Sequence, residues 1–211
     1  MNRISSITCA LLLTAVPAFA DDLTPPPWRF GAGTTVQHWD FSAGLLGGAP
    51  DALPLNNPYG TPLLTPLGAS TFVANAAGRS DIWDISGGGV LSFRVPNTGV
   101  QTHQKDLWLQ VTFFSVATLP PPAYTVLAPV GNFSLVSSQV TPLANGWYHQ
   151  LTQWNSPICP PFESIQISPG LAGAITLIDQ VVIDTYCHPV PAPSAAAPLA
   201  LAGLVAFRRR R

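Results

Sequence analysis

The chain of 211 residues is 47% hydrophobic and only 9% charged, a balance that argues against intrinsic disorder, which needs the opposite. A single lysine, Lys105, and a single glutamate, Glu163, leave few of the residues that helix surfaces favour. From Asp21 to Val190 four basic and ten acidic residues give a net charge of −6, which argues against the basic surface that nucleic-acid binding requires.

The first 20 residues have the three parts of a secretory signal peptide. Arg3 supplies the positive start, Ile7 to Val16 form a short apolar stretch, and Ala18 and Ala20 make a small-x-small cleavage site. The apolar stretch is too short to span a membrane, and a buried N-terminal helix is the alternative interpretation. We therefore expect an exported protein that loses residues 1–20.

Residues 21–188 predict one β-rich domain. The 23 prolines and 17 glycines break helices and supply turns, and residues that favour strands fill the space between them. Strand-like runs cover Thr34–Ser42, Val90–Val95, Leu107–Val116, Phe133–Val140, Trp147–Trp154, Phe162–Ser168 and Ala174–Thr185. The last run is apolar on both faces, which predicts a strand in the centre of its sheet.

About nine such segments predict an all-β fold, an antiparallel two-sheet β-sandwich, for which we expect a jelly roll. An Ig-like sandwich is the alternative. Ala43 to Ser70, with five prolines and five glycines, is expected to be a long loop that is either functional or disordered.

Two cysteines, Cys159 and Cys187, remain after removal of the signal peptide, which contains Cys9. In an oxidising compartment such a pair predicts a disulfide. It would close a loop of about 28 residues and add roughly 3 kcal/mol to the free energy of unfolding. Two free or metal-binding thiols are the alternative.

No motif indicates a catalytic centre. The chain lacks a Gly-x-Ser-x-Gly elbow, a His-Glu-x-x-His motif and an EF-hand loop, and His38, His103, His149 and His188 lie far apart in sequence. A glycosidase needs two carboxylates at one cleft, and the ten acidic residues do not single out a pair. We expect a protein that is not an enzyme and needs no cofactor.

Calcium is the one metal that the sequence leaves open, with Asp179 and Asp184 at the last strand as weak candidates. Asp184 is expected to be a solvated residue at the strand end. Asp179 is in phase with Leu177 and Val181, so we expect its side chain to point toward a core. A buried carboxylate needs partners, which makes Asp179 either a hydrogen-bonding hub or a calcium ligand, unless it is not truly buried.

Six tryptophans serve either as core anchors or as flat platforms for sugar rings. Trp147 and Trp154 should lie on opposite faces of one strand because their separation is odd. Trp108 should point away from the apolar face of its own strand. We take Trp108, Trp147, Trp154 and the neighbouring Tyr148 as the candidate ligand-binding residues.

The chain ends in three short segments. A linker over 189–194 contains Pro191-Ala192-Pro193, an apolar stretch runs from Ala195 to Phe207, and Arg208, Arg209, Arg210 and Arg211 follow. The apolar stretch is short of the hydrocarbon core of a bilayer. The arginines would stay on the cytoplasmic side, so we expect a transient membrane association.

This ending, with its final 195–211 segment, resembles the PEP-CTERM sorting signal. The resemblance implies that exosortase, a membrane transpeptidase-like enzyme, handles the chain, and that the protein belongs with exopolysaccharide at the cell surface or outside the cell. Ala192 stands where the usual motif has Glu, and Pro198 interrupts the apolar segment. An ordinary C-terminal membrane anchor is the alternative.

The mature domain is similar to exported PEP-CTERM proteins of planctomycete type. The matching pieces are Asn57-Pro58-Tyr59-Gly60-Thr61-Pro62, Val95-Pro96-Asn97, Lys105 to Thr112, Gly146-Trp147-Tyr148 and Ile178 to Thr185. The Ile-Asp-x-Val piece also resembles galactose-binding-like jelly rolls, many of which bind glycans. We expect a structural or adhesive protein of the envelope or exopolysaccharide. The alternatives are a carbohydrate-binding module and a polysaccharide-acting enzyme.

Overall fold

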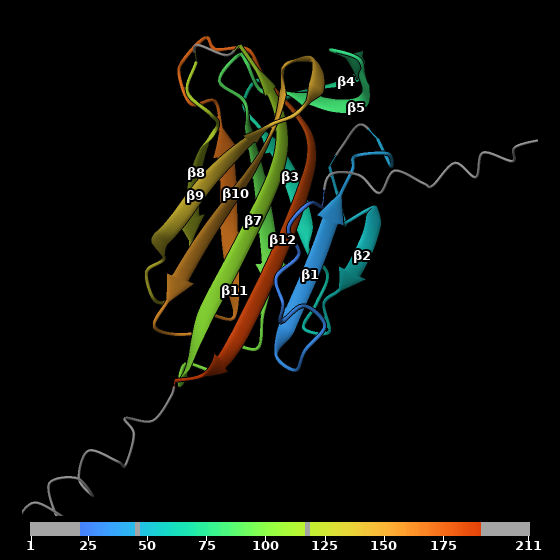
Figure 1. The fold of residues 1–211 in the computed structure, drawn as a ribbon. Coiled ribbons are helices and arrows are strands. Elements are labelled where there is room, and N and C mark those ends of the chain that lie inside the picture. The colour runs from blue at the N-terminus through green and yellow to red at the C-terminus, as the bar shows by residue number, and fades with distance from the viewer. Residues whose placement is uncertain (1–21, 45–46, 117–118, 191–211) are drawn as a thin grey trace, which may run out of the picture.

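The computed structural model describes residues 22–44, 47–116 and 119–190 (Figure 1). The predicted signal peptide with Ala18 and Ala20 lies outside the described residues, as does the predicted sorting segment 191–211. Within the described ranges, no helix is long and apolar enough to cross a membrane.

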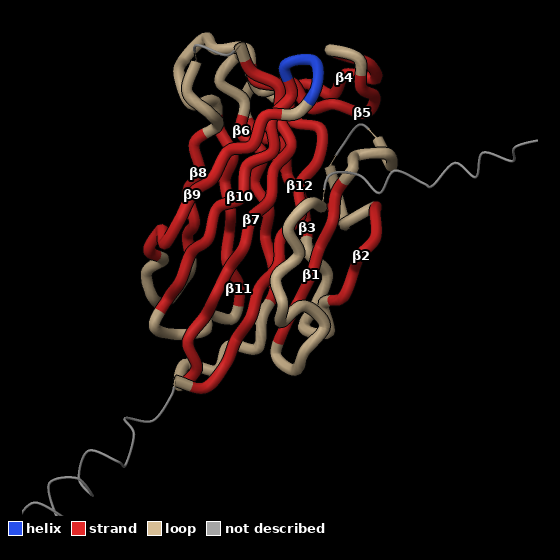
Figure 2. Tube along the Cα trace, in the orientation of Figure 1, coloured by secondary structure: helices blue, strands red, loops and turns tan. Residues whose placement is uncertain are grey.

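Strands account for nearly all regular structure in the described part of the chain, where the only helical element is the 3-10 turn η1, Ala144–Gly146 (Figure 2). The strands are β1 (Thr34–Trp39), β2 (Ala52–Asn56), β3 (Leu63–Leu67), β4 (Thr71–Ala76), β5 (Arg79–Asp84), β6 (Val90–Pro96), β7 (His103–Ser115), β8 (Ala123–Leu127), β9 (Ser134–Pro142), β10 (Trp147–Ser156), β11 (Phe162–Ser168) and β12 (Thr176–Pro189).

The strands form two antiparallel sheets. The large sheet has the order β2-β1-β12-β7-β10-β9, and the β4–β5 hairpin joins it where β5 pairs with β12. The small sheet has the order β3-β6-β11-β8. The predicted antiparallel two-sheet sandwich is therefore confirmed, while the jelly-roll topology stays a prediction.

The core lies between the two sheets and is built from alternate residues of their strands. Strand β7 contributes Leu107, Leu109, Val111 and Phe113, which all lie on the face that meets the small sheet. The other buried members include Trp39, Leu91, Phe93, Val95, Ile165, Ile167, Ile178, Val181 and Ile183. Because strand side chains alternate between faces, the same strands carry a second set of residues on the outer face of the large sheet.

The predicted central position of the last strand is confirmed. Strand β12 pairs with β1 on one side and with β7 on the other, and the three lie side by side in Figure 1. Neighbouring residues Val181, Val182 and Ile183 are all buried, so both faces of β12 are covered. A strand covered on both sides needs a continuous apolar run rather than an alternating one.

The prediction of a long loop over Ala43–Ser70 is wrong, because β2 and β3 lie within it. Both strands are sheet edges, and each contains a proline, Pro54 in β2 and Pro66 in β3. Proline lacks an N–H to donate but is tolerated at a sheet edge, where one side of the strand has no neighbour. The described residues form twelve strands rather than about nine; of the other strands without a predicted run, β4 and β8 are sheet edges, whereas β5 pairs with both β4 and β12.

The prediction that Asp179 points toward the core is also wrong. The pairing of β12 with β7 shifts register between Ile178 and Gln180, so Asp179 is the extra residue of a β-bulge. A bulge reverses the alternation on either side of it. Ile178 and Val181 face the core, whereas Leu177 belongs to the outer cluster with Trp147.

Candidate functional site

Trp147 is buried on the outer face of the large sheet, with 2% of the residue exposed. Its indole N–H donates to the backbone oxygen of Ala77 at 2.9 Å, and the Arg79 guanidinium lies 4.7 Å from the ring centroid. The β4–β5 hairpin therefore covers this ring. Trp147 presents no open face to a ligand, which corrects its place among the candidate ligand-binding residues.

Trp154 and Tyr148 lie on β10, as Trp147 does, but they are half-buried rather than fully buried. Both pack against the core cluster, and the Tyr148 ring stacks on Phe113 with centroids 5.5 Å apart. Trp147 belongs to a separate outer cluster. The prediction that Trp147 and Trp154 lie on opposite faces is confirmed, and only partial ring surface of Trp154 and Tyr148 is open to solvent.

Trp108 points away from the core, as predicted, and stands in a row of half-buried rings. Its indole meets Trp28 edge-to-face at 6.1 Å, Trp28 stacks on Tyr186 at 5.4 Å, and Tyr186 stacks on His188 at 4.5 Å. We call these four residues the ring row. The other three rings are not among the predicted ligand-binding residues, although the spacing of Tyr186 and His188 on one strand places them on the same face.

The two acids proposed as calcium ligands each contact an arginine. Asp179 accepts from Arg79 at 2.5 Å. Asp184 accepts two hydrogen bonds from Arg29, each 2.6 Å long, and Arg29 also binds Asp22. Asp184 is fully buried, so the expectation of a solvated strand-end residue is wrong. Among the described residues no group of three or more His, Cys, Asp or Glu side chains is arranged to hold a metal ion.

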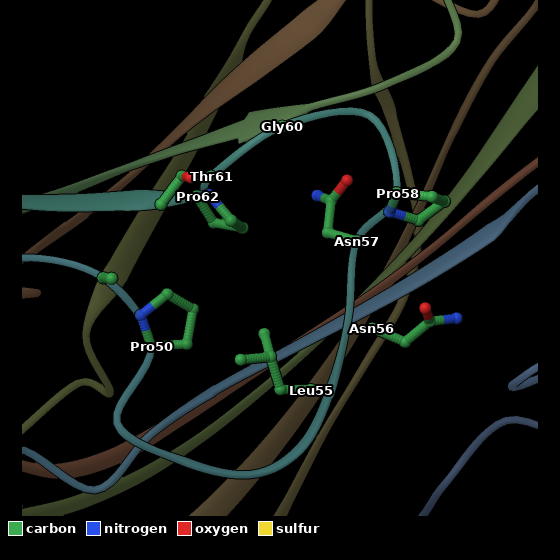
Figure 3. A pocket seen from close by; sticks show the side chains of 9 residues that line it. Pro50, Leu55, Asn56, Asn57, Pro58, Gly60, Thr61 and Pro62 are labelled. Atoms are coloured by element: carbon green, nitrogen blue, oxygen red, sulfur yellow. The ribbon is translucent and has the colours of Figure 1, made fainter.

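A shallow open hollow of about 360 Å³ lies where the chain passes from β2 to β3 (Figure 3). It is lined by Ala49, Pro50, Leu55, Asn56, Asn57, Pro58, Gly60, Thr61 and Pro62. None of these side chains titrates. The Asn57 amide is held by the Gln37 side-chain oxygen at 2.7 Å, so the loop is anchored to β1. The hollow offers apolar and amide contacts but no acid or base.

The predicted disulfide between Cys159 and Cys187 is confirmed, with a Cα–Cα distance of 5.7 Å. Cys187 belongs to β12 of the large sheet, and Cys159 lies in the turn that enters β11 of the small sheet. Both residues are buried. The bridge therefore ties the two sheets together at the end of the sandwich where β12 finishes (Figure 1).

A buried polar cluster lies at the same end, between the sheets. It consists of Lys105 at the start of β7, Asn97 directly after β6, and Glu163 in β11. Lys105 and Glu163 are 0% exposed and Asn97 is 8% exposed. We call these three residues the buried triad.

The triad is closed by three contacts. The Lys105 ammonium donates to Asn97 Oδ1, and Asn97 Nδ2 donates to Glu163 Oε2. Lys105 Nζ lies 3.5 Å from Glu163 Oε1, an ion-pair distance, and this oxygen accepts no hydrogen bond. An amine thus sits at the oxygen end of an amide whose nitrogen end faces a carboxyl group.

Burial shifts both titrating groups of the triad toward their neutral forms. Loss of solvent lowers the pKa of Lys105 to about 8, against the raising effect of the Glu163 charge. Loss of solvent likewise raises the pKa of Glu163 above its ordinary value, although Lys105 and Asn97 oppose the shift. A neutral amine is a nucleophile, whereas an ammonium is not.

The triad is not among the predicted sites, but the sequence contains a signal for two of its members. Lys105 is in phase with Leu107 and Leu109 on β7, and Glu163 is in phase with Ile165 on β11. Strict alternation therefore points the only lysine and the only glutamate inward. No local pattern marks Asn97, which reaches the site through its position in the turn after β6.

No protein-family model matches the chain, and a search of curated proteins finds no match either. The resemblance to exported PEP-CTERM proteins of planctomycete type therefore rests on the sequence motifs alone.

Proposed function

We propose that this chain is an exported, exosortase-sorted protein of the cell surface or extracellular matrix. Its β-sandwich is non-catalytic and has a structural or adhesive role in exopolysaccharide or the envelope. The observation that carries the proposal is the buried Cys159–Cys187 disulfide between the two sheets. Such bridges form and persist in oxidising compartments outside the cytosol.

The surroundings of the titrating side chains support a non-catalytic role toward external substrates. Asp184 and Asp179 hold arginines, and Glu163 is sealed between the sheets. His38 is buried between the Leu53 backbone oxygen at 2.6 Å and the Gln180 amide at 2.6 Å. These contacts favour stability of the sandwich over proton transfer to a substrate.

The partners that this proposal requires are an exosortase-type enzyme, acting on the Pro191-Ala192-Pro193 segment, and exopolysaccharide. Strand β12 ends at Pro189, directly before this motif in the sequence. The sandwich and the sorting segment are therefore separated along the chain by only a few residues. A cleavage at the motif would leave the disulfide-tied domain intact.

The experiment that tests this proposal is fractionation of cells that express the full chain, with and without exosortase. We expect processed protein outside the cytosol, with both thiols unavailable to an alkylating reagent until reduction. Replacement of the four terminal arginines by serine should retain export but abolish exosortase-dependent processing. Intact, unprocessed chain in the cytosol with reduced thiols would contradict the proposal.

A carbohydrate-binding function is the second candidate, and the ring row supports it. The four half-buried rings come from the segment before β1, from β7 and from β12, and they lie together on the side of the large sheet that faces away from the core. Sugar rings stack on the open faces of such aromatic side chains. Pull-down with purified exopolysaccharide should lose the Trp108→Ala variant and retain Trp154→Ala, which removes a ring on the opposite face. Equal retention of both variants and the wild type would leave only the structural role.

A further inference from the structure

We propose that Lys105 and Asn97 become joined by an intramolecular isopeptide bond, from Lys105 Nζ to Asn97 Cγ, with release of ammonia and with Glu163 as the proton carrier. The resulting covalent link would connect the end of β6 in the small sheet with the start of β7 in the large sheet. It is a self-modification of the chain, distinct from any activity on an external substrate.

The geometry of the buried triad supports this bond. The Lys105 amine contacts Asn97 Oδ1, which is bonded directly to Cγ, the carbon that the amine would attack. The leaving nitrogen, Nδ2, contacts Glu163 Oε2, while the other oxygen of the same carboxyl group lies 3.5 Å from Lys105 Nζ. One carboxyl group therefore reaches both the atom that loses a proton and the atom that gains one.

The step balances without a further reactant. Lys105 Nζ forms a bond to Cγ, and the bond from Cγ to Nδ2 breaks. Glu163 first takes a proton from the Lys105 ammonium, which leaves a neutral amine and a carboxylic acid. As the amine attacks, Glu163 donates a proton to Nδ2 through one oxygen and accepts the second proton of Nζ through the other, so Nδ2 leaves as ammonia and Glu163 ends as the neutral acid. An amine and a primary amide become a secondary amide and ammonia, with no change in oxidation state.

The surroundings of the triad favour this reaction. The three side chains are held together in the folded state, which replaces a bimolecular encounter by an intramolecular one. Burial lowers the pKa of Lys105 to about 8, so the neutral, nucleophilic amine is accessible near neutral pH. Water is excluded from the fully buried amine and carboxyl group, so hydrolysis does not compete with attack by the amine.

The product also relieves an electrostatic cost of the fold. A buried ion pair loses its solvation and recovers that loss only when its remaining hydrogen bonds are satisfied. Here Glu163 Oε1 accepts none. Bond formation converts the lysine to a neutral amide and leaves Glu163 free to remain protonated, so two buried charges disappear.

The test is the intact mass of the full chain, purified from whichever compartment holds it and measured after reduction and denaturation. We expect a mass about 17 Da below the value calculated for the processed sequence, the mass of one ammonia. Asn97→Ala removes the amide and Lys105→Arg removes the primary amine while keeping the positive charge. Both variants, and Glu163→Gln, should have their full calculated masses.

Peptide mapping then locates the missing mass. Trypsin cleaves after a free lysine, so we expect resistance to cleavage at Lys105 in the wild type. The peptide from Asp84 to Lys105, released by a protease that cleaves before aspartate, contains both joined residues. Its fragmentation should show no backbone breaks between Asn97 and Lys105. A cyclic imide at an asparagine also loses ammonia but leaves Lys105 cleavable, and would persist in Lys105→Arg.

A wild-type chain of full calculated mass overturns the proposal, and so does a deficit that persists in Lys105→Arg or in Asn97→Ala. Formation of the Cys159–Cys187 disulfide and a β-type circular dichroism spectrum identify the variants that fold. The wild-type mass and its peptide map decide the question even if no variant folds. Neither readout depends on export or sorting, so this inference and the proposed function fail independently.

Discussion

Lys105 and Cys187 are directly opposed on the paired strands β7 and β12. The other cysteine, Cys159, has its sulfur 3.3 Å from the hydroxyl of Thr98, the residue that follows Asn97. The disulfide and the buried triad therefore occupy the same level of the sandwich. The disulfide and the isopeptide bond would therefore both connect the two sheets at the end of the domain that precedes the sorting segment.

Removal of the disulfide by the paired change Cys159→Ala and Cys187→Ala is expected to lower the free energy of unfolding by about 3 kcal/mol. The physical reason is the 28-residue separation of the two cysteines, since the bridge restricts that loop in the unfolded chain. Urea denaturation measures the loss. Reductant should produce a similar loss in the wild type and none in the double variant, and a loss in both would refute this assignment.

The isopeptide bond should stabilise the fold by about 2 kcal/mol, which is less than the contribution of the disulfide, because Asn97 and Lys105 are only 8 residues apart. Its contribution should survive reductant, unlike that of the disulfide. The comparison is urea denaturation of the reduced wild type against reduced Asn97→Ala. Identical midpoints for the two reduced proteins would show that no link constrains this loop.

The stability of uncross-linked Glu163→Gln should rise with pH. In the folded site without the isopeptide bond, burial lowers the pKa of the Lys105 amine to about 8, whereas the ordinary value is 10.5. Glu163 is the main group that opposes this shift, so its removal lowers the pKa further. Between the folded and the unfolded pKa the unfolded chain binds more protons, so the free energy of unfolding increases as the pH rises through this window.

The measurement is the urea midpoint at several values between pH 7 and pH 10, the range about the ordinary lysine pKa. The cross-linked wild type should lack this rise, because an amide nitrogen does not titrate there. A double variant with Glu163→Gln and Lys105→Met should lack it too, and serves as the matched control. Parallel profiles for Glu163→Gln and the double variant would be the contrary result.

A continuous apolar run was sufficient to predict the central position of β12, and alternation along one strand was sufficient to predict the opposite faces of Trp147 and Trp154. It failed at Asp179 because a bulge depends on the pairing of two strands and leaves no mark in one of them. It failed at β2 and β3 because their prolines resemble loop residues unless the strand is known to be an edge.

The candidate site was harder to predict than the fold. Alternation points Lys105 and Glu163 inward, but only the pairing of distant strands brings them within 3.5 Å of each other. The same holds for Asp184, whose partner Arg29 lies in the N-terminal segment, 155 residues away in the sequence. Contacts of this kind depend on tertiary packing, which single-strand patterns do not encode.

Trp147→Ala should destabilise the domain by about 3–5 kcal/mol, because it removes a large buried side chain. The ring packs with Ile82 and Leu177 and holds the β4–β5 hairpin. Trp108→Ala removes a half-buried ring, so it should lower the stability of the domain clearly less than Trp147→Ala does. Thermal unfolding of the two variants measures the difference. A larger loss for Trp108→Ala would mean that the ring row serves the stability of the fold rather than a ligand.

Arg29→Ala should lower the free energy of unfolding by about 3–5 kcal/mol, because it leaves a buried carboxylate without its partner. The guanidinium makes two hydrogen bonds to the fully buried Asp184 and also binds Asp22. Arg79→Ala is the comparison, since the Arg79–Asp179 pair is partly exposed, and loss of this pair together with the contact to the Trp147 ring should cost only about 1–2 kcal/mol.

The loss in Arg29→Ala is attributed to the unpaired charge of Asp184, and this cause has its own test. Adding Asp184→Asn should restore part of the stability, because an amide of the same shape carries no charge to desolvate. Urea denaturation of the two single variants and the double variant gives the coupling between the residues. Additive losses would indicate that the pair contributes through packing alone and that the charge of Asp184 is not the reason Arg29 is needed.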